Sequence, residues 1–223
     1  MAPSPNSASA PPERGSRPGG PPGGGGAGPA ILDDTAIRRA LMRIAHEIVE
    51  RNADPDELYI VAIPNGGVPL GRCLVQNIAG ISDVRPPLGI LDTTLYRDDL
   101  ATSGERPMLR QTEMPSSVDD RVVVLVEDVV NTGRTIRAAM DALMDFGRPR
   151  MVQVVALVDR GHRELPIKID FVGKNIPTQP REKVRLLAEP TGEHPMRVVL
   201  ERAEERPATG PPDVAATRGG GSA

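Results

Sequence analysis

Runs of consecutive apolar residues alternate along this chain with stretches in which apolar residues recur every three or four positions. The apolar runs, which predict buried strands, cover residues 58–63, 88–93, 122–126 and 152–158. The stretches with helical spacing, which predict helices with one buried face, cover residues 33–51, 68–79 and 135–146. Shorter strands are expected near residues 169–172, 184–188 and 196–200. Residues 101–120 lack apolar periodicity and are expected to form a mobile excursion.

This alternation of strands and helices is typical of the α/β class, with a mostly parallel sheet flanked by helices on both faces. Ligands of such sheets bind at the carboxyl ends of the strands. Three polar or glycine-rich loops follow predicted strands, at residues 65–67, 127–135 and 159–163. The pattern therefore places a candidate binding site where these three loops converge.

The second loop has the chemistry for a sugar phosphate. Glu127 and Asp128 offer acceptors for sugar hydroxyls or for the hydration shell of Mg²⁺. Thr132 is expected to cap the following helix, and Gly133 can adopt the backbone angles of a tight turn. Backbone N–H groups at a helix start attract anions. Strand–turn–helix units of this kind also occur without any ligand, so the turn alone leaves both interpretations open.

Composition bounds the folded part of the chain. Residues 1–30 and 204–223 are rich in Pro, Gly, Ser and Ala, which predicts two disordered tails around one domain of residues 31–203. The net charge of −3 argues against bulk attraction to nucleic acid. No secretory signal or membrane span is evident, and Cys73 is the only cysteine. A reducing, cytoplasmic location without membrane contact is expected.

Basic residues recur on one side of the first predicted helix. Arg39, Arg43 and His46 follow helical spacing opposite its apolar face. By periodicity alone, such a stripe is most simply a solvated surface.

Longer strings carry a resemblance to known families. Residues 123–135 (VVLVEDVVNTGRT) resemble the phosphoribosyl diphosphate (PRPP) motif of type I phosphoribosyltransferases. The chain is further similar to the PyrR family in residues 31–47, in 91–100 with LYRDDL, in 158–166 with DRGHRELP and in 172–178. The resemblance covers nearly all of the predicted domain and neither tail.

The resemblance implies a type I phosphoribosyltransferase-like fold with a small hood subdomain. It implies uracil phosphoribosyltransferase activity, in which uracil and PRPP give UMP and diphosphate. Mg²⁺ would enter with PRPP rather than through direct protein ligands. It also implies UMP-dependent binding to the leader mRNA of pyrimidine genes, which attenuates transcription, and assembly as a homodimer or a dimer of dimers.

Site roles follow from the same resemblance. Glu127 and Asp128 would hold the ribose hydroxyls and stabilise the reacting centre, while Arg97, on a hood and loop formed by residues 94–120, would neutralise diphosphate. The expected PRPP- and UMP-binding residues are Asn65, Gly66, Gly67, Asn131, Thr132, Gly133, Arg134, Thr135, Asp159, Arg160, Lys174 and Ile176. The expected RNA-binding residues are Arg39, Arg43, His46, Arg51, His162 and Arg163. His46 and His162 could equally be structural histidines.

Three positions depart from the family pattern. Gly66 stands where an arginine of the diphosphate loop is usual, Asn131 where a tyrosine is usual, and Met42 where a threonine is usual. The loss of one charge-assisted bond corresponds to about 1.5–3 kcal/mol. Gly66 therefore motivates a second hypothesis, a non-catalytic UMP-sensing regulator. Met42 and the acidic net charge motivate a third, a phosphoribosyltransferase without an RNA role.

Overall fold

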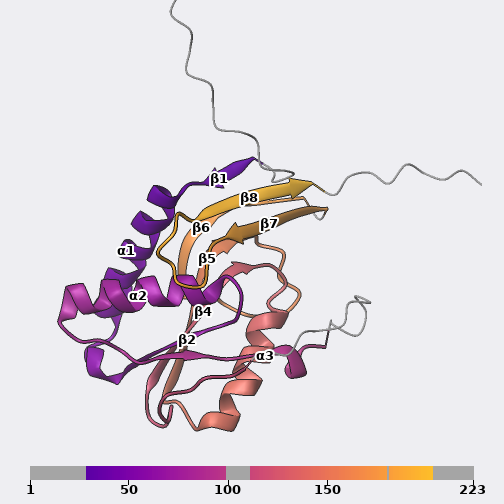
Figure 1. The fold of residues 1–223 in the computed structure, drawn as a ribbon. Helices are drawn as coiled ribbons and strands as arrows, with labels where there is room; N and C mark the ends of the chain where they lie inside the picture. The colour runs from indigo at the N-terminus through magenta and orange to yellow at the C-terminus, as the bar shows by residue number, and fades with distance from the viewer. Residues whose placement is uncertain (1–28, 99–110, 180, 203–223) are drawn as a thin grey trace, which may run out of the picture.

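A parallel sheet of five strands forms the centre of the molecule (Figure 1), in a computed structural model that describes residues 29–98, 111–179 and 181–202. Its strand order is β3-β2-β4-β5-β6, and every neighbouring pair runs parallel. The strands are β2 (Leu58–Ala62), β3 (Leu88–Ile90), β4 (Val122–Val130), β5 (Met151–Asp159) and β6 (Phe171–Asn175). The predicted α/β class with a mostly parallel sheet is confirmed.

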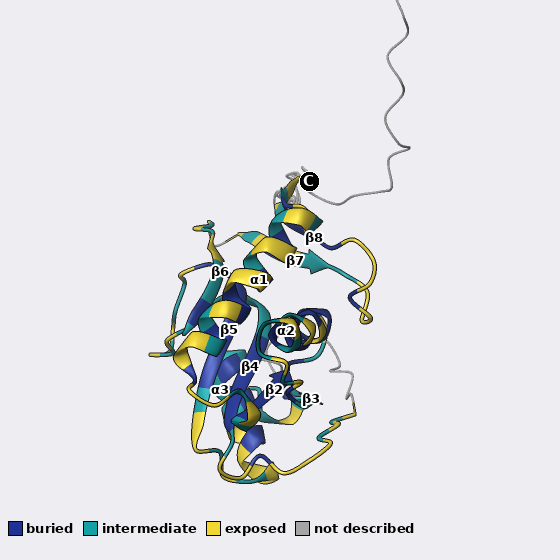
Figure 2. Ribbon diagram, turned by 90° about the vertical axis from the view of Figure 1, so that its left-hand side faces the viewer, coloured by how far each residue is buried: buried dark blue, intermediate teal, exposed yellow. Residues whose placement is uncertain are grey.

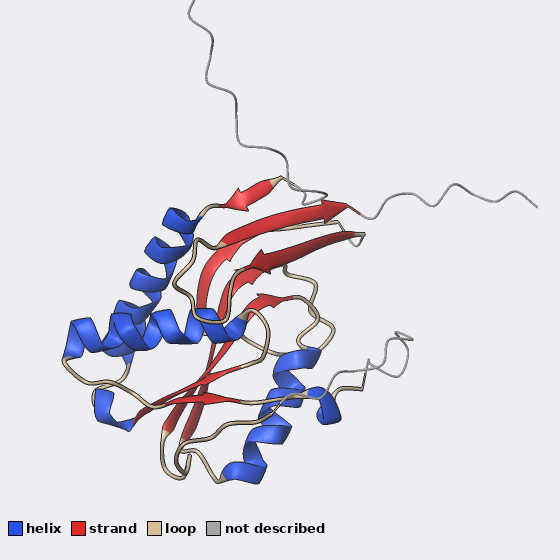
Figure 3. Cartoon of the chain, in the orientation of Figure 1, coloured by secondary structure: helices blue, strands red, loops and turns tan. Residues whose placement is uncertain are grey.

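Helices cover both faces of this sheet, which explains why its strands read as continuous apolar runs. Helices α1 (Asp34–Arg51) and α2 (Gly67–Ser82) lie on one face, and α3 (Arg134–Leu143) lies on the other (Figures 1 and 3). Alternate side chains of one strand enter different cores: Leu58 and Ile60 pack with α1 and α2, whereas Tyr59 and Val61 pack in the core that contains the α3 side chains.

Helix α1 shows how local sequence produces an element. The Asp33 carboxylate caps its start by accepting from the Ala36 N–H at 2.8 Å. The residues predicted to be apolar-face positions, including Ile37, Leu41 and Ile48, are fully buried. The opposite face of the helix is exposed (Figure 2).

Strands from the two ends of the described domain form a second, smaller sheet above the first (Figure 1). Strands β1 (Ala30–Leu32), β8 (Arg197–Arg202) and β7 (Glu182–Leu187) pair antiparallel in the order β1-β8-β7. The strands of this smaller sheet lie outside residues 94–120, the segment expected to form the hood and flexible loop, and that expectation stays a prediction. No local pattern reveals this arrangement, because it depends on pairing between the two ends of the domain.

The remaining differences concern element boundaries. Strand β4 continues through Glu127 and Asp128 to Val130, and the predicted helix 135–146 divides into α3 and a 3₁₀ turn, η4 (Met144–Phe146). Further 3₁₀ turns are η1 (Pro55–Glu57) and η2 (Thr94–Tyr96).

Some expectations lie outside the described residues: the tail of residues 1–28, the tail from residue 203 onward, and the first half of the expected mobile excursion, residues 101–110. Among the helices that the structure describes, none combines the length and apolar character needed to cross a bilayer.

Candidate nucleotide site

Three loops meet at the carboxyl edge of the parallel sheet, as their positions in the sequence predict. The loop after β2 is joined to β4 by a hydrogen bond from the Ile63 N–H to the Val126 carbonyl at 3.0 Å. The loop after β5 is joined to β4 by a bond from the Arg160 N–H to the Val130 carbonyl, also 3.0 Å. Strand β4 therefore holds the other two loops on its flanks.

A small pocket of about 180 Å³ opens beside the end of β4. It is lined by Arg97, Glu127, Val129, Val130, Asn131, Thr132, Gly133, Thr135 and Ile136. Two oxygen atoms in this lining, Glu127 Oε2 and Asn131 Oδ1, are buried without a hydrogen-bond partner. Because unpaired buried acceptors are costly, they indicate that a ligand with matching donors completes the pocket.

The floor of the small pocket is the start of α3. Gly133 is the N-cap residue and has a φ of 91°, which an L side chain rarely adopts. The Thr132 cap expected from the sequence is wrong: its hydroxyl accepts only weakly from the Arg134 N–H, at 3.4 Å. The Thr132 side chain lines the pocket with the first turn of the helix, whose N–H groups favour an anion.

Two adjacent carboxylates define the electrostatics of the site. Burial, reinforced by the Asp128 charge and opposed by the Arg97 charge, raises the pKa of Glu127 well above its ordinary value. Burial also raises the pKa of Asp128, although backbone N–H groups that bond to its carboxylate act in the opposite direction. Both acids are therefore held in a poorly solvated place where cationic or hydroxyl groups of a ligand interact strongly.

A larger cleft of about 620 Å³ lies next to the small pocket and shares Val129 and Asn131 with it. Its lining combines the loops of the main sheet with β7 and the residues after it: Asn65, Gly66, Asp128, Val129, Asn131, Arg160, Val184, Arg185, Leu186, Ala188 and Pro190. The two hollows together form a continuous candidate site that extends from the α3 N-terminus to the second sheet.

The loop after β2 approaches β4 so closely that it has no room for side chains. A Cβ on Gly66 would lie 2.1 Å from Asp128 Oδ2, and a Cβ on Gly67 would lie 2.4 Å from the Val126 carbonyl oxygen. An arginine at position 66 is therefore incompatible with the observed position of Asp128. The carboxylate occupies the space that a side chain at position 66 would need.

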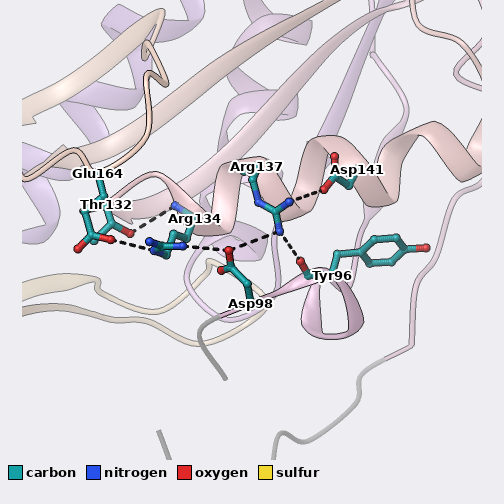
Figure 4. Close-up of polar contacts among 7 residues, drawn as sticks. All are labelled: Tyr96, Asp98, Thr132, Arg134, Arg137, Asp141 and Glu164. Carbon is teal, nitrogen blue, oxygen red and sulfur yellow. Dashed lines mark hydrogen bonds and ion pairs between the residues drawn. The ribbon is translucent and has the colours of Figure 1, made fainter. Parts of the chain in front are cut away.

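Arg97 lies in the small pocket and not in the cleft beside Gly66. The small pocket is the one that ends at the phosphate-type turn, and the expected contact of Arg97 with diphosphate stays a prediction. Arg134, expected to bind PRPP, lies outside both pockets and pairs with Glu164 and Asp98, each at 2.9 Å (Figure 4). Its side chain therefore contacts other loops.

Of four other residues that were expected to bind the nucleotide, one lines the candidate site and three do not. Arg160 lines the cleft, and its guanidinium donates to Thr178 Oγ1 at 2.8 Å and to the Glu182 carbonyl. Asp159, Lys174 and Ile176 line neither pocket. The Asp159 carboxylate accepts from the Gly161 N–H and from Arg163, so it shapes the loop after β5.

Most of the expected RNA-binding residues have partners within the protein. Arg43 donates to the Val172 and Gly173 carbonyls and pairs with Glu47, while Arg51 pairs with Asp170. His162 contacts the Thr178 carbonyl at 2.7 Å. In contrast, Arg39 and His46 are exposed on the outer face of α1.

Arg163, the remaining expected RNA-binding residue, is hydrogen-bonded to the turn between β4 and α3 that lines the small pocket. Its guanidinium donates to the Asn131 carbonyl at 2.8 Å, to Asp159 and to the Ile167 carbonyl. The Thr132 carbonyl accepts from the Glu164 and Leu165 N–H groups. The DRGHRELP segment is thus bonded directly to the turn that lines the small pocket.

Three residues in the surroundings of the site, Asp98, Arg137 and Glu164, were not predicted as site residues. Arg137 donates to the Tyr96 carbonyl at 2.9 Å, and its Nε is buried without a partner (Figure 4). Asp98 and Glu164 belong to the LYRDDL and DRGHRELP strings, so the strings contained the signal, but only the fold pairs them with α3.

The fold and the converging loops define a phosphoribosyltransferase. The sequence profile of the phosphoribosyl transferase domain matches residues 29–185. Hypoxanthine phosphoribosyltransferases share the fold: the Staphylococcus aureus enzyme has a TM-score of 0.54 at 21% identity, covering 69% of this chain and 80% of its own. The Trypanosoma cruzi enzyme has a TM-score of 0.58 at 21% identity, covering 73% and 86%.

More similar sequences identify the family within this class. A bifunctional protein PyrR of Pelotomaculum thermopropionicum is 55% identical over 175 residues, which cover 78% of this chain and 96% of the relative. The bifunctional protein PyrR of Deinococcus radiodurans is 50% identical over 161 residues, covering 72% and 88%. The chain belongs to the PyrR family. This family combines regulation of pyrimidine genes with uracil phosphoribosyltransferase activity.

Proposed function

We propose that this chain transfers the ribose phosphate of PRPP to uracil, giving UMP and diphosphate. The observation that carries the proposal is the small pocket, in which two unpartnered buried oxygens, on Glu127 and Asn131, lie beside a helix N-terminus. Acceptors for a sugar's hydroxyl groups and N–H donors for its phosphate are thus present in one pocket.

The sizes of the two hollows support the placement of the substrate. A volume of about 180 Å³ suits a ribose phosphate but is below the range of roughly 300–1,000 Å³ usual for whole ligands. We place the 5′-phosphate against Gly133 and Thr135, and the ribose hydroxyls against Glu127 and Asp128. Uracil and diphosphate then occupy the larger cleft beside Asn65 and Arg160.

The reaction needs positioning and charge stabilisation more than proton transfer. A nitrogen of uracil forms a bond to C1 of the ribose as the bond from C1 to the diphosphate oxygen breaks. Diphosphate leaves with the electron pair of that bond, and the proton of the uracil nitrogen is released to the departing diphosphate or to water. Positive charge develops on the ribose, and the carboxylates of Glu127 and Asp128 are placed to stabilise it. The pocket walls keep water away from C1.

Phosphoribosyltransferases use Mg²⁺ together with PRPP, where the ion neutralises the diphosphate. The unpartnered Glu127 Oε2 and the neighbouring Asp128 carboxylate fit a hydrated ion that enters with the substrate. Within residues 29–98, 111–179 and 181–202, no group of three or more His, Cys, Asp or Glu side chains is placed to hold a metal by itself.

The assay that tests the proposal measures UMP formation from uracil and PRPP with Mg²⁺. We expect activity in the natural chain, a loss of about 100-fold or more in kcat for Asp128→Asn, and little change for Asp141→Asn, an exposed acid on the outer side of α3. Calorimetric UMP binding without any product would reject catalysis and support the second hypothesis, a UMP-sensing regulator. That hypothesis is favoured by the missing arginine at Gly66.

We further propose that UMP-dependent binding to leader mRNA uses the exposed face of α1. Arg39 and His46 lie on this face, and Arg43 and Arg51 lie along the same helix with their charges partly compensated by Glu47 and Asp170. Because the net charge is −3, RNA binding requires a local basic surface of this kind.

Leader RNA titrated at several salt concentrations, with and without UMP, tests this surface. Arg39→Ala should weaken binding and reduce the log–log salt slope by about 1. Arg72→Ala, which removes an exposed arginine from α2, is the matched control and should leave the slope unchanged. Equal effects of the two substitutions would reject α1 as the RNA surface, and no binding at all would favour a phosphoribosyltransferase without an RNA role.

Two expectations from the family resemblance complete the proposal. A homodimer or dimer of dimers is expected, and sedimentation equilibrium of the full chain measures it. A cytoplasmic location is consistent with Cys73, the only cysteine, which is buried and unable to form an internal disulfide.

A further inference from the structure

Residues 96–98 are attached to α3 at several points (Figure 4), and Tyr96 is also bonded to η4. The Tyr96 hydroxyl donates to the Asp145 carboxylate, which lies in η4. Arg137 donates to the Tyr96 carbonyl at 2.9 Å. Asp98 accepts from Arg134 at 2.9 Å and lies 3.9 Å from Arg137. The segment is therefore anchored on both sides of its middle residue.

That middle residue is Arg97, which lines the small pocket with Glu127 and Gly133. It follows the 3₁₀ turn η2 and has an extended backbone, with φ −82° and ψ 129°. On either side of it, the Tyr96 hydroxyl bonds to η4 and the Asp98 carboxylate pairs with α3. The Arg97 charge is close enough to Glu127 to oppose the rise of its pKa.

The arginines that hold Asp98 are placed by the helix itself. Arg134 and Arg137 are three residues apart, so they lie on the same face of α3, at its first turn. Asp98 thus meets two guanidinium groups near the positive end of a helix. Arg134 also pairs with Glu164, so the same side chain connects the segment of residues 96–98 with the loop after β5.

We infer that Asp98 is a positioning residue that holds Arg97 in the ribose-phosphate pocket through its ion pairs with Arg134 and Arg137. The inference rests on the proposed function, because it assigns a role in the binding of the same ligand. Asp98 itself lines neither pocket, and its effect on the ligand is exerted through Arg97.

A double-mutant cycle with Asp98→Asn and Arg97→Gln tests this inference. The readouts are the KM for PRPP, kcat, the dissociation constant of UMP and the melting temperature. Asp98→Asn should weaken PRPP and UMP binding about three- to tenfold with little change in melting temperature. In the Arg97→Gln background it should have no further effect, because the residue that it positions is gone. Asp98→Glu should restore most of the loss.

Asp141→Asn is the matched control. Asp141 also pairs with Arg137, at 3.0 Å, and its side chain is 52% exposed against 46% for Asp98, but it does not contact residues 96–98. Its substitution should change UMP affinity less than twofold.

Several outcomes would overturn the inference. They are independent, additive effects of Asp98→Asn and Arg97→Gln, equal effects of Asp98→Asn and Asp141→Asn, or unchanged ligand affinity in Arg97→Gln. If the natural chain binds UMP but forms none from PRPP, the catalytic proposal fails by itself, and the cycle is then decided on UMP affinity alone.

Discussion

At the scale of single residues, the positions of Gly66 and Asp128 depend on each other. Position 66 lacks the arginine expected from the family resemblance, and the Asp128 carboxylate fills the space where a side chain would begin, 2.1 Å from a Cβ at that position. The missing cation and the placement of the acid are therefore one structural feature.

A substitution of Gly66 tests this dependence. Gly66→Ala should displace Asp128, destabilise the protein by about 1–3 kcal/mol and weaken ribose binding. Gly80→Ala is the matched control, since Gly80 lies in α2 with nothing within 4 Å of its Cβ position. That change should stabilise the protein by about 0.5–1 kcal/mol. Denaturant unfolding and UMP calorimetry measure both, and a Gly66→Ala variant as stable as the natural protein would contradict the expectation.

The raised pKa of Glu127 gives a pH-dependent expectation. Between the ordinary Glu pKa of about 4.3 and the raised value, the folded ligand-free protein binds more protons than the unfolded chain. Its stability therefore falls as the pH rises through this window. Glu127→Gln removes this contribution, so the variant should gain melting temperature relative to the natural protein as the pH rises from 4 to 8.

An exposed acid provides the control for that pH series. Glu193→Gln changes a carboxylate on the loop between β7 and β8, where the side chain is exposed. Its melting temperature should follow that of the natural protein at every pH. If the melting temperature of Glu127→Gln also follows that of the natural protein at every pH, the expectation drawn from the raised pKa of Glu127 is wrong.

At the scale of elements, the site depends on the unit formed by β4, the turn after it and α3. Glu127 near the end of β4, the turn at Gly133 and the first turn of α3 all line the small pocket, and Asp128 lines the adjoining cleft. The DRGHRELP segment holds the same turn from outside, through Arg163 and the N–H groups of Glu164 and Leu165. A change at the turn therefore affects both the small pocket and the loop that contains His162.

The substitution Gly133→Ala tests whether the shape of the turn between β4 and α3 is needed for UMP binding. The residue has a φ of 91°, and a Cβ would lie 3.1 Å from Ile167 Cγ1, so the turn must shift. UMP affinity should fall at least about fivefold, which corresponds to about 1 kcal/mol. Gly161→Ala is the matched control, because Gly161 also has a positive φ, 78°, but nothing lies within 4 Å of its Cβ position. It should cost about 1–2 kcal/mol of backbone strain without the loss of UMP affinity.

At the scale of the whole molecule, the two ends of the domain complete the binding cleft. Strand β1 pairs with β8, β8 pairs with β7, and β7 provides Val184 and Leu186 to the wall of the larger cleft. Met196 and Val198 belong to the same core as α1 and α2. The second sheet is thus packed on the first through a shared core.

Truncations test which residues this assembly needs. A chain of residues 29–202 should keep the melting temperature and UMP affinity of the full chain, in line with the prediction that both tails are disordered. Removal of β1 as well, in a chain of residues 33–202, takes away the buried Leu32 and the pairing with Val198 and Val199. It should lower stability by roughly 2 kcal/mol or more. Equal stability of the two truncated chains would contradict this role of β1.

Local patterns in the sequence were sufficient for the main elements of the fold. The apolar runs at residues 58–63 and 122–126 match β2 and β4, and the apolar spacing at residues 33–51 matches α1. These elements were predictable because the burial of one or both faces requires apolar residues at regular positions in the sequence. The boundaries at Val130 and Leu143 differed from the expected ones, since strand pairing and 3₁₀ geometry depend on neighbours.

The sequence by itself determined the class of the protein, its family and the turn at residues 127–135, because these depend on contiguous strings and local periodicity. Only the tertiary structure decided what the scattered charges do. It placed Arg97 in the small pocket, brought Arg134 between Asp98 and Glu164, and formed the second sheet from both ends of the domain. Such contacts join residues far apart in the chain, and their partners are selected by packing and hydrogen bonding in the folded state, which no local pattern records.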